Sequence, residues 1–171
     1  MSIQGAFNTV IGNTERAIGV YKYFQNMEFD AAGSRIQNTA KSINTTAGDF
    51  RDIANYNARE ADEVEREKVV RDSKTGRFMK GSDAAQAMRE GRVVPYIASA
   101  QKAEDAARLL GDTLAGLEAA RGDSLFARRE ALKKVDKITN SVEDYARDIR
   151  DKARDTAHKY ELEDVIKGDK R

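Results

Sequence analysis

The chain has 171 residues, of which 40% are hydrophobic and 35% are charged, and its 30 lysines and arginines nearly balance 29 aspartates and glutamates. The net charge of +1 excludes a chain-wide electrostatic attraction to nucleic acid or acidic membranes, so any such binding must be local. Cysteine is absent, which excludes disulfides, thiolate metal sites and cysteine nucleophiles. No stretch approaches the roughly 20 apolar residues of a membrane-spanning helix, and no secretory signal pattern opens the chain. We therefore expect neither a secreted precursor nor an integral membrane protein.

The first predicted element is an amphipathic helical segment over residues 1–29. Between Met1 and Asn26 only Glu15, Arg16 and Lys22 are charged. We expect this segment to contact a membrane (through residues 1–26) or other subunits. The contact would use one broad apolar face, whose members are Ile3, Phe7, Val10, Ile11, Ile18, Tyr21 and Phe24. The alternative is an irregular coil with incidental apolar residues.

Glycines recur every seven residues beside this face, as Gly5, Gly12 and Gly19. Each glycine costs a helix about 1 kcal/mol relative to alanine. A cost repeated at a fixed position indicates that another backbone approaches closely there, as small residues permit in tight helix crossings.

Residues 30–70 predict a long helix, because apolar and small residues recur at alternating steps of four and three. This stripe consists of Ile36, Ala40, Ile43, Ala47, Phe50, Ala54, Asn57, Ala61 and Val64. It is narrow and rich in alanine, so its stability is expected to come from packing among several helices or several copies. Gly48 is a plausible bend. The helix is expected to end near Arg71, where Ser73, Thr75 and Gly76 favour a turn.

Residues 71–95 are expected to form a basic loop and a short helix. The stretch from Arg71 to Lys80 holds four cations against one anion. Such a loop can grip phosphates and stack an aromatic ring on a base. The candidate nucleic-acid-binding residues, for DNA in particular, are Arg71, Lys74, Arg77, Phe78 and Lys80. The alternative is a solvated linker whose Phe78 and Met79 dock on a neighbouring helix.

The short helix is predicted over Ala84–Glu90, with Ser82 or Asp83 as its N-cap and Gly91 as its stop. Arg92–Val94 should then be extended, because Pro95 disfavours helical geometry in the residue before it.

Residues 96–171 predict an antiparallel helical hairpin, beginning near Pro95 and ending near Glu163, followed by a polar tail. The chain should reverse at the turn formers Arg121, Gly122 and Asp123. One stripe runs from Ile97 to Leu117 and the other from Leu132 to Tyr160. The helix-packing residues are expected to be Leu110, Leu114, Leu117, Leu132, Val135, Val142 and Ile149. The predicted fold is all-α, with elongated long helices, this hairpin and coiled-coil-like packing.

Catalytic chemistry has little support in this sequence. His158 is the only histidine, and it lies in a charged stretch without a second histidine or a carboxylate pair at ligand spacing. The aspartates of the last helix have arginine or lysine within a turn, which explains them by mutual neutralisation. We expect no enzyme, no catalytic or metal-binding residues and no cofactor.

Three features together resemble the small helical internal virion proteins, or ejection proteins, of tailed bacteriophages. They are the charge-poor start with its spaced glycines, the run Tyr56–Ala61 that leads into a charged helix, and Leu109-Leu110-Gly111 in a later helix. The resemblance implies a structural component of the virion that forms homo-oligomers with itself and contacts other virion proteins near the portal or tail. It further implies that the protein assists DNA passage across the host envelope.

Two other functions fit the same sequence. One is a cytoplasmic coiled-coil adaptor or scaffold protein that binds a partner through the stripe Leu110, Leu114 and Leu117. The other is a nucleic-acid-binding helical protein that acts through residues 71–80.

Overall fold

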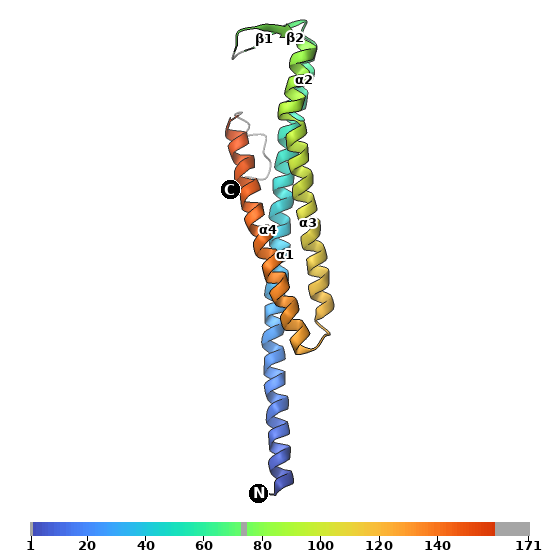
Figure 1. Ribbon diagram of the computed structural model, residues 1–171, viewed down its shortest axis with the longest axis vertical. Coiled ribbons are helices and arrows are strands. Elements are labelled where there is room, and N and C mark those ends of the chain that lie inside the picture. Colours follow the sequence, from blue (N-terminus) through green and yellow to red (C-terminus); the bar gives the residue numbers. More distant parts are fainter. Residues whose placement is uncertain (1, 73–74, 160–171) are drawn as a thin grey trace. The chain divides into compact units, whose positions relative to one another are not determined.

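The computed structural model describes residues 2–72 and 75–159, and 88% of these residues are helical. The predicted all-α class is therefore confirmed, whereas coiled-coil packing stays a prediction (Figure 1). The helices are α1 (Ile3–Glu65), α2 (Gly81–Arg92), α3 (Val94–Ala120) and α4 (Leu125–Lys159). A two-stranded antiparallel sheet of β1 (Val69–Arg71) and β2 (Phe78–Lys80) lies between α1 and α2 in the sequence. Lys74, Tyr160 and the expected polar tail lie outside the described residues.

The first helix differs from the sequence prediction at both ends. A boundary was expected between residues 29 and 30, yet α1 continues through this point and through Gly48 as one helix. Met27 and Glu28 are good helix formers and neither glycine nor proline interrupts them, so nothing local breaks the helix. At the other end α1 stops at Glu65, before the expected end near Arg71, because the following residues enter the sheet.

The chain divides into two compact units. The first unit comprises Met1–Asn38 and Leu110–Ser141, and in it α4 lies parallel to α1. Gln25 of α1 donates a hydrogen bond to the Leu125 carbonyl (3.2 Å), and Arg35, further along α1, pairs with Asp136 (2.8 Å). The α3 segment lies antiparallel to α1, since Arg121, just after α3, reaches Asp30 (2.6 Å), whereas Leu114, earlier in α3, lies near Gly33, later in α1. The chain therefore reverses between α3 and α4, at the turn that the sequence predicted.

The second unit comprises Thr39–Leu109 and Val142–Arg171. Its core includes Phe50 and Ile53 of α1, both fully buried, and the Phe50 ring stacks on that of Tyr96 with centroids 6.2 Å apart. Arg51 forms two hydrogen bonds with the Glu104 carboxylate, at 2.8 and 2.9 Å. These contacts hold α1 against α3 within this unit.

The predicted stripes agree with the observed burial. In α1 every member from Ile36 to Val64 is buried or half-buried. Of the seven predicted packing residues, five are buried and two, Leu114 and Leu132, are half-buried. Ile97, the first member of the α3 stripe, is 45% exposed and so is not a core residue.

The segment between α1 and α3 shows three further corrections. Residues 69–71 and 78–80 are paired strands, where the end of the long helix (69–70) and a loop (from residue 71) were expected. The short helix begins at Gly81 rather than Ala84. Its N-cap residue is Lys80 rather than Ser82 or Asp83, and no side chain makes a capping hydrogen bond there. Val94 is already helical rather than extended. Pro95 therefore lies in the first turn of α3, where its missing N–H removes no helical hydrogen bond.

Candidate functional site

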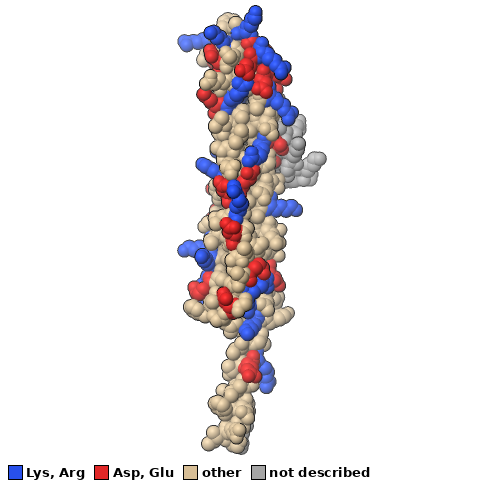
Figure 2. Space-filling view, turned by 90° about the vertical axis from the view of Figure 1, so that its right-hand side faces the viewer, with Lys and Arg blue, Asp and Glu red and all other residues tan. Residues whose placement is uncertain are grey.

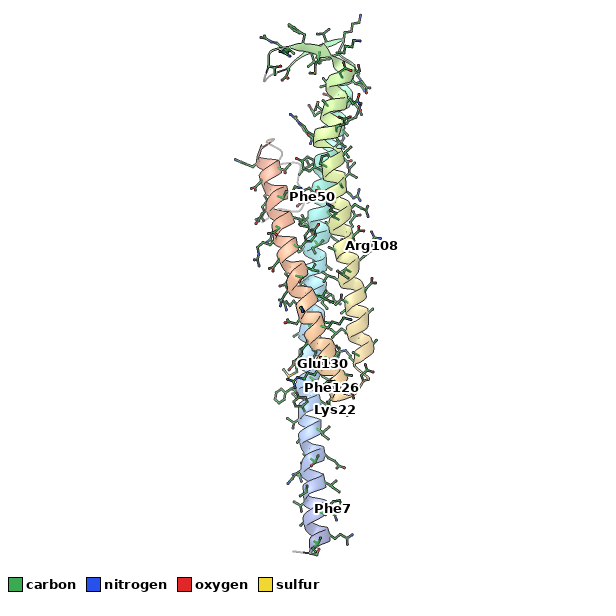
Figure 3. The ribbon with its side chains drawn as sticks, viewed as in Figure 1. Phe7, Lys22, Phe50, Arg108, Phe126 and Glu130 are labelled. Carbon is green, nitrogen blue, oxygen red and sulfur yellow. The ribbon has the colours of Figure 1, made fainter. Side chains whose placement is uncertain are left out.

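The beginning of α1 is an apolar surface that the first unit leaves uncovered. None of residues 2–24 is buried, and Gln25 is the first buried residue of the described chain. All seven apolar residues predicted to contact a membrane or another subunit are exposed, with Ile3 at 92%, Phe7 at 63% and Val10 at 62%. Figure 3 shows Phe7 on a stretch of α1 with no other helix beside it. At the usual rise of about 1.5 Å per residue, this stretch is about 33 Å long.

The same stretch is poor in charge. Figure 2 shows mostly uncharged surface at the end where α1 begins, whereas lysines, arginines and acidic residues alternate over the rest of that face. Tyr23 is also exposed, and together with Tyr21 and Phe24 it gives three exposed aromatic rings just before the first buried residue. Contiguous exposed apolar surface of this kind marks an interaction site.

A series of small residues, here called the column, recurs at seven-residue spacing along α1 from this uncovered stretch into the packed part, and in a straight helix it drifts by about 20° per repeat. Every seventh residue from 5 to 61 is small or short, in the order Gly5, Gly12, Gly19, Asn26, Gly33, Ala40, Ala47, Ala54 and Ala61. In the packed part the column is where other helices approach, since a Cβ on Gly33 would lie 3.6 Å from Leu114 Cδ1 and Ala47, Ala54 and Ala61 are buried. Near Gly19 no atom of the described residues lies within 4 Å of such a Cβ.

From the sequence alone, the spaced glycines and the Ile36 stripe are two separate features. Their common seven-residue spacing is the signal that joins them. The column therefore continues into a region where this chain supplies no partner helix among its described residues.

The packed part of α1 begins at a cluster around Phe29. The guanidinium carbons of Arg121 and Arg128 lie 5.4 and 5.2 Å from the centroid of this fully buried ring. Arg128 is itself buried and donates a hydrogen bond to the Asn26 side chain. Cation–π contacts of desolvated arginines contribute on the order of 2 kcal/mol. The cluster therefore anchors α1 just after the end of its uncovered stretch.

The basic segment presents most of its predicted side chains on one side of the sheet. The register pairs Val69 with Lys80 and Arg71 with Phe78. Opposite residues of an antiparallel pair project from the same face, and all four of these are exposed. The other face carries Val70 and Met79, which are half-buried. The structure thus brings Arg71, Phe78 and Lys80 of the predicted site together on one face, whereas Arg77, although exposed, precedes β2 and is not placed on this face by the register.

The turn between the strands is closed by local hydrogen bonds. Gly76 has φ +68°, in the left-handed region that favours glycine, and its N–H donates to the Asp72 carbonyl (2.8 Å). The Thr75 hydroxyl donates to the Asp72 carboxylate (3.0 Å), and Arg71 Nε donates to the Gly76 carbonyl (3.3 Å). This turn fixes the strand ends and the orientation of the exposed face.

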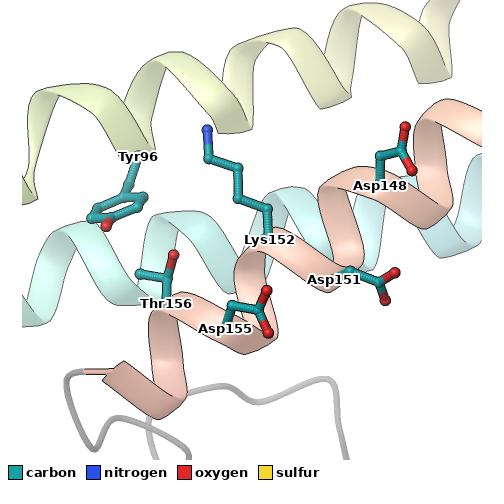
Figure 4. A pocket seen from close by; sticks show the side chains of 6 residues that line it. All are labelled: Tyr96, Asp148, Asp151, Lys152, Asp155 and Thr156. Atoms are coloured by element: carbon teal, nitrogen blue, oxygen red, sulfur yellow. The ribbon is translucent and has the colours of Figure 1, made fainter.

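A third candidate is an open hollow in the second unit, where the start of α3 faces the end of α4. It is lined by Tyr96, Asp148, Asp151, Lys152, Asp155 and Thr156 (Figure 4). Its carboxylates are spread along α4 rather than converging on one point (Figure 4). Among the described residues no group of histidine and carboxylate side chains is placed to hold a metal ion, and His158 is exposed.

The shifted pKa values of the second unit belong to structural contacts. The hydrogen bond from Arg51 lowers the pKa of the Glu104 carboxyl. Burial, together with the Asp105 carboxylate, raises the pKa of the Tyr145 hydroxyl. Neither group lines the hollow, so these shifts do not mark a catalytic pair.

Similarity to other proteins gives no assignment for these surfaces. None of the helices that the structure describes is both long enough and apolar enough to cross a membrane. No protein-family model matches the chain, and neither a curated protein nor a solved structure is significantly similar to it.

Proposed function

We propose that this protein is a structural, self-assembling helical component of a tailed-phage virion, of the internal or ejection class. In this proposal residues 3–24 make the contacts between copies. Two observations support it best: the exposed apolar residues of this stretch and, on another side of the same helix, the glycines that continue the seven-residue spacing of the packed part.

A second copy fits this stretch better than a lipid surface does. Glycines repeated at seven-residue spacing permit close approach of a helix, which a lipid surface does not require. Glu15 and Arg16 are adjacent in the middle of the stretch, where deep burial in lipid would be costly. Neighbouring helices can instead pair such charges with each other.

The adaptor function loses the surface on which it was based. Leu110 and Leu117 are fully buried within the chain, and Leu114 lies against Gly33 of α1. A partner could reach this stripe only by displacing a helix of the same unit. The assignment to a virion is supported by the resemblance to ejection proteins, and mass spectrometry of purified phage particles tests it directly.

Self-assembly is tested by replacing two exposed apolar residues of the stretch with charges. The full-length protein should form oligomers whose mass rises with concentration in sedimentation velocity, and Phe7→Glu with Ile18→Glu should convert them to monomers. Both positions are exposed in the monomer, so the fold should be retained. Unchanged helical circular dichroism and thermal midpoint verify this.

The matched control places two glutamates on exposed positions of α1 outside this stretch. Asn44→Glu with Asn55→Glu adds the same charge at the same spacing and should leave the oligomers intact. A wild-type protein that stays monomeric at high concentration contradicts the proposal. Binding to lipid vesicles by such a monomer, abolished by Phe7→Glu with Ile18→Glu, would assign the stretch to a membrane surface.

A further inference from the structure

We propose that the exposed face of the β1–β2 hairpin binds single-stranded nucleic acid. Phosphates would be held by Arg71 and Lys80, and one base would stack on Phe78. The proposal does not depend on self-assembly. In the strand register Arg71 lies directly opposite Phe78. Lys80 follows Phe78 by two residues and projects from the same face. The Cβ atoms of such an opposite pair are about 5 Å apart, so a cation adjoins the aromatic ring.

The ring is available for stacking. Phe78 is 72% exposed, and a phenylalanine so exposed on a short strand adds nothing to the core. Stacking on an aromatic side chain needs an unpaired base, which a single strand offers and a duplex does not. The ring and its cations together match the stacking platform and cationic surface that proteins use for single strands.

The cations are available for phosphates. Within the part of the chain that the structure describes, no ion pair involves Arg71, Arg77 or Lys80, and the Arg71 bond to Gly76 uses only Nε. Two nearby carboxylates, Asp62 and Glu65, are each 2.7 Å from the Arg89 guanidinium. The negative charge at the end of α1 is thus partly compensated by α2, and the hairpin keeps its positive charge.

The platform is fixed before any ligand arrives. The turn is closed at Asp72 and Gly76, and β2 continues directly into α2. At that junction a Cβ on Gly81 would lie 1.9 Å from the Glu67 carbonyl oxygen and 2.5 Å from that of Val64, so the backbones are in tight contact. A site held in place in this way loses less conformational entropy on binding.

Cationic side chains favour nucleic acid over a lipid surface as the ligand. Insertion into lipid by a single exposed phenylalanine would need apolar neighbours, yet only Val69 of the other residues on this face is apolar. Arg71 and Lys80 border the ring instead, and both suit a phosphate backbone.

Binding is measured by fluorescence anisotropy of labelled 20-nucleotide oligo(dT) and of a 20-base-pair duplex. The full chain carrying Phe7→Glu and Ile18→Glu is used throughout, which removes avidity from any oligomer. We expect tighter binding to the single strand than to the duplex. Arg71→Ala with Lys80→Ala should weaken it at least about tenfold and reduce the slope of log K against log salt by about 1.4. Phe78→Ala should weaken it about tenfold without changing this slope, and Phe78→Tyr should retain the affinity.

The control removes two exposed cations elsewhere, by Arg129→Ala with Lys137→Ala, and should leave the affinity unchanged. Circular dichroism and thermal midpoints should be equal among the variants, because the replaced side chains are exposed. Absence of oligo(dT) binding at 50 mM salt overturns the proposal, as does an equal loss in the control. Binding to vesicles rich in phosphatidylserine but not to oligo(dT), lost in Phe78→Ala, overturns it in favour of a lipid surface. Monomeric wild-type protein that still binds oligo(dT) refutes self-assembly alone.

Discussion

At the residue scale, Gly19 and Gly48 allow the role of the small-residue column to be separated from helix propensity. Both lie in α1, both are exposed, and neither would bring a Cβ within 4 Å of another described residue. Gly19 belongs to the column and Gly48 does not. Any difference between alanine substitutions at these two positions therefore reports on contacts outside the monomer.

Gly19→Ala and Gly48→Ala should each stabilise the helix by about 0.5–1 kcal/mol, because alanine removes the entropic penalty of glycine. Only Gly19→Ala should weaken self-assembly, since the added methyl group would keep a neighbouring helix at a greater distance. Thermal unfolding of the assembly-deficient variant measures the first effect, and sedimentation of the assembling protein measures the second. Equal sedimentation of both variants would show that no backbone approaches Gly19.

At the element scale, the contact of α3 with its neighbours in the first unit depends on a few large side chains among many alanines. Leu117 is fully buried there, whereas Leu109 of the same helix is 49% exposed. Leu117→Ala should lower the free energy of unfolding by about 2–5 kcal/mol, as expected when a core leucine leaves a cavity. Leu109→Ala should cost much less, and both are measured by urea denaturation. Equal effects of the two substitutions would contradict this packing.

The sequence predicted those elements whose pattern is long and periodic. The α1 and α4 stripes and the turn near Gly122 were correct, because burial on one helical face repeats over many residues. The β1–β2 hairpin was not predicted, because strands of three residues have too few positions to show alternation. Val69-Val70 and Phe78-Met79 do, however, flank clear turn formers. The start of α3 differs from the prediction because proline is tolerated in the first turn of a helix. Pro95 therefore does not keep Val94 extended.

For the candidate sites, sequence identified residue types but not their arrangement. The cations and Phe78 were recognised, yet only the pairing of Arg71 with Phe78 shows that they share a face. The uncovered apolar face was recognised as well. Its relation to the buried column became apparent only when burial along α1 was known, because exposed and buried helix faces have the same period.

At the scale of the whole molecule, the two proposed activities should differ in their dependence on salt concentration. Self-assembly would use a stretch with three charged residues, Glu15, Arg16 and Lys22, so it should persist between 50 and 500 mM sodium chloride. Binding of oligo(dT) should be lost over the same range, because it depends on displacing counterions. Sedimentation and anisotropy in one buffer series measure both. Dissociation of the oligomers by 500 mM salt would indicate that ion pairs, rather than apolar contacts, hold the copies together.

The tight contact at Gly81 restricts how this sequence can diverge. Any side chain at this position would meet backbone oxygens rather than a flexible group, and even the methyl group of an alanine would lie too close to them. Surface residues of the hairpin can change with the ligand, and core residues can exchange volume with their neighbours, but this glycine has no substitute. Distant homologues that share the fold should therefore keep a glycine immediately after their second strand. That single position, with the seven-residue column of small residues before it, provides a signature for recognising them when overall identity has faded.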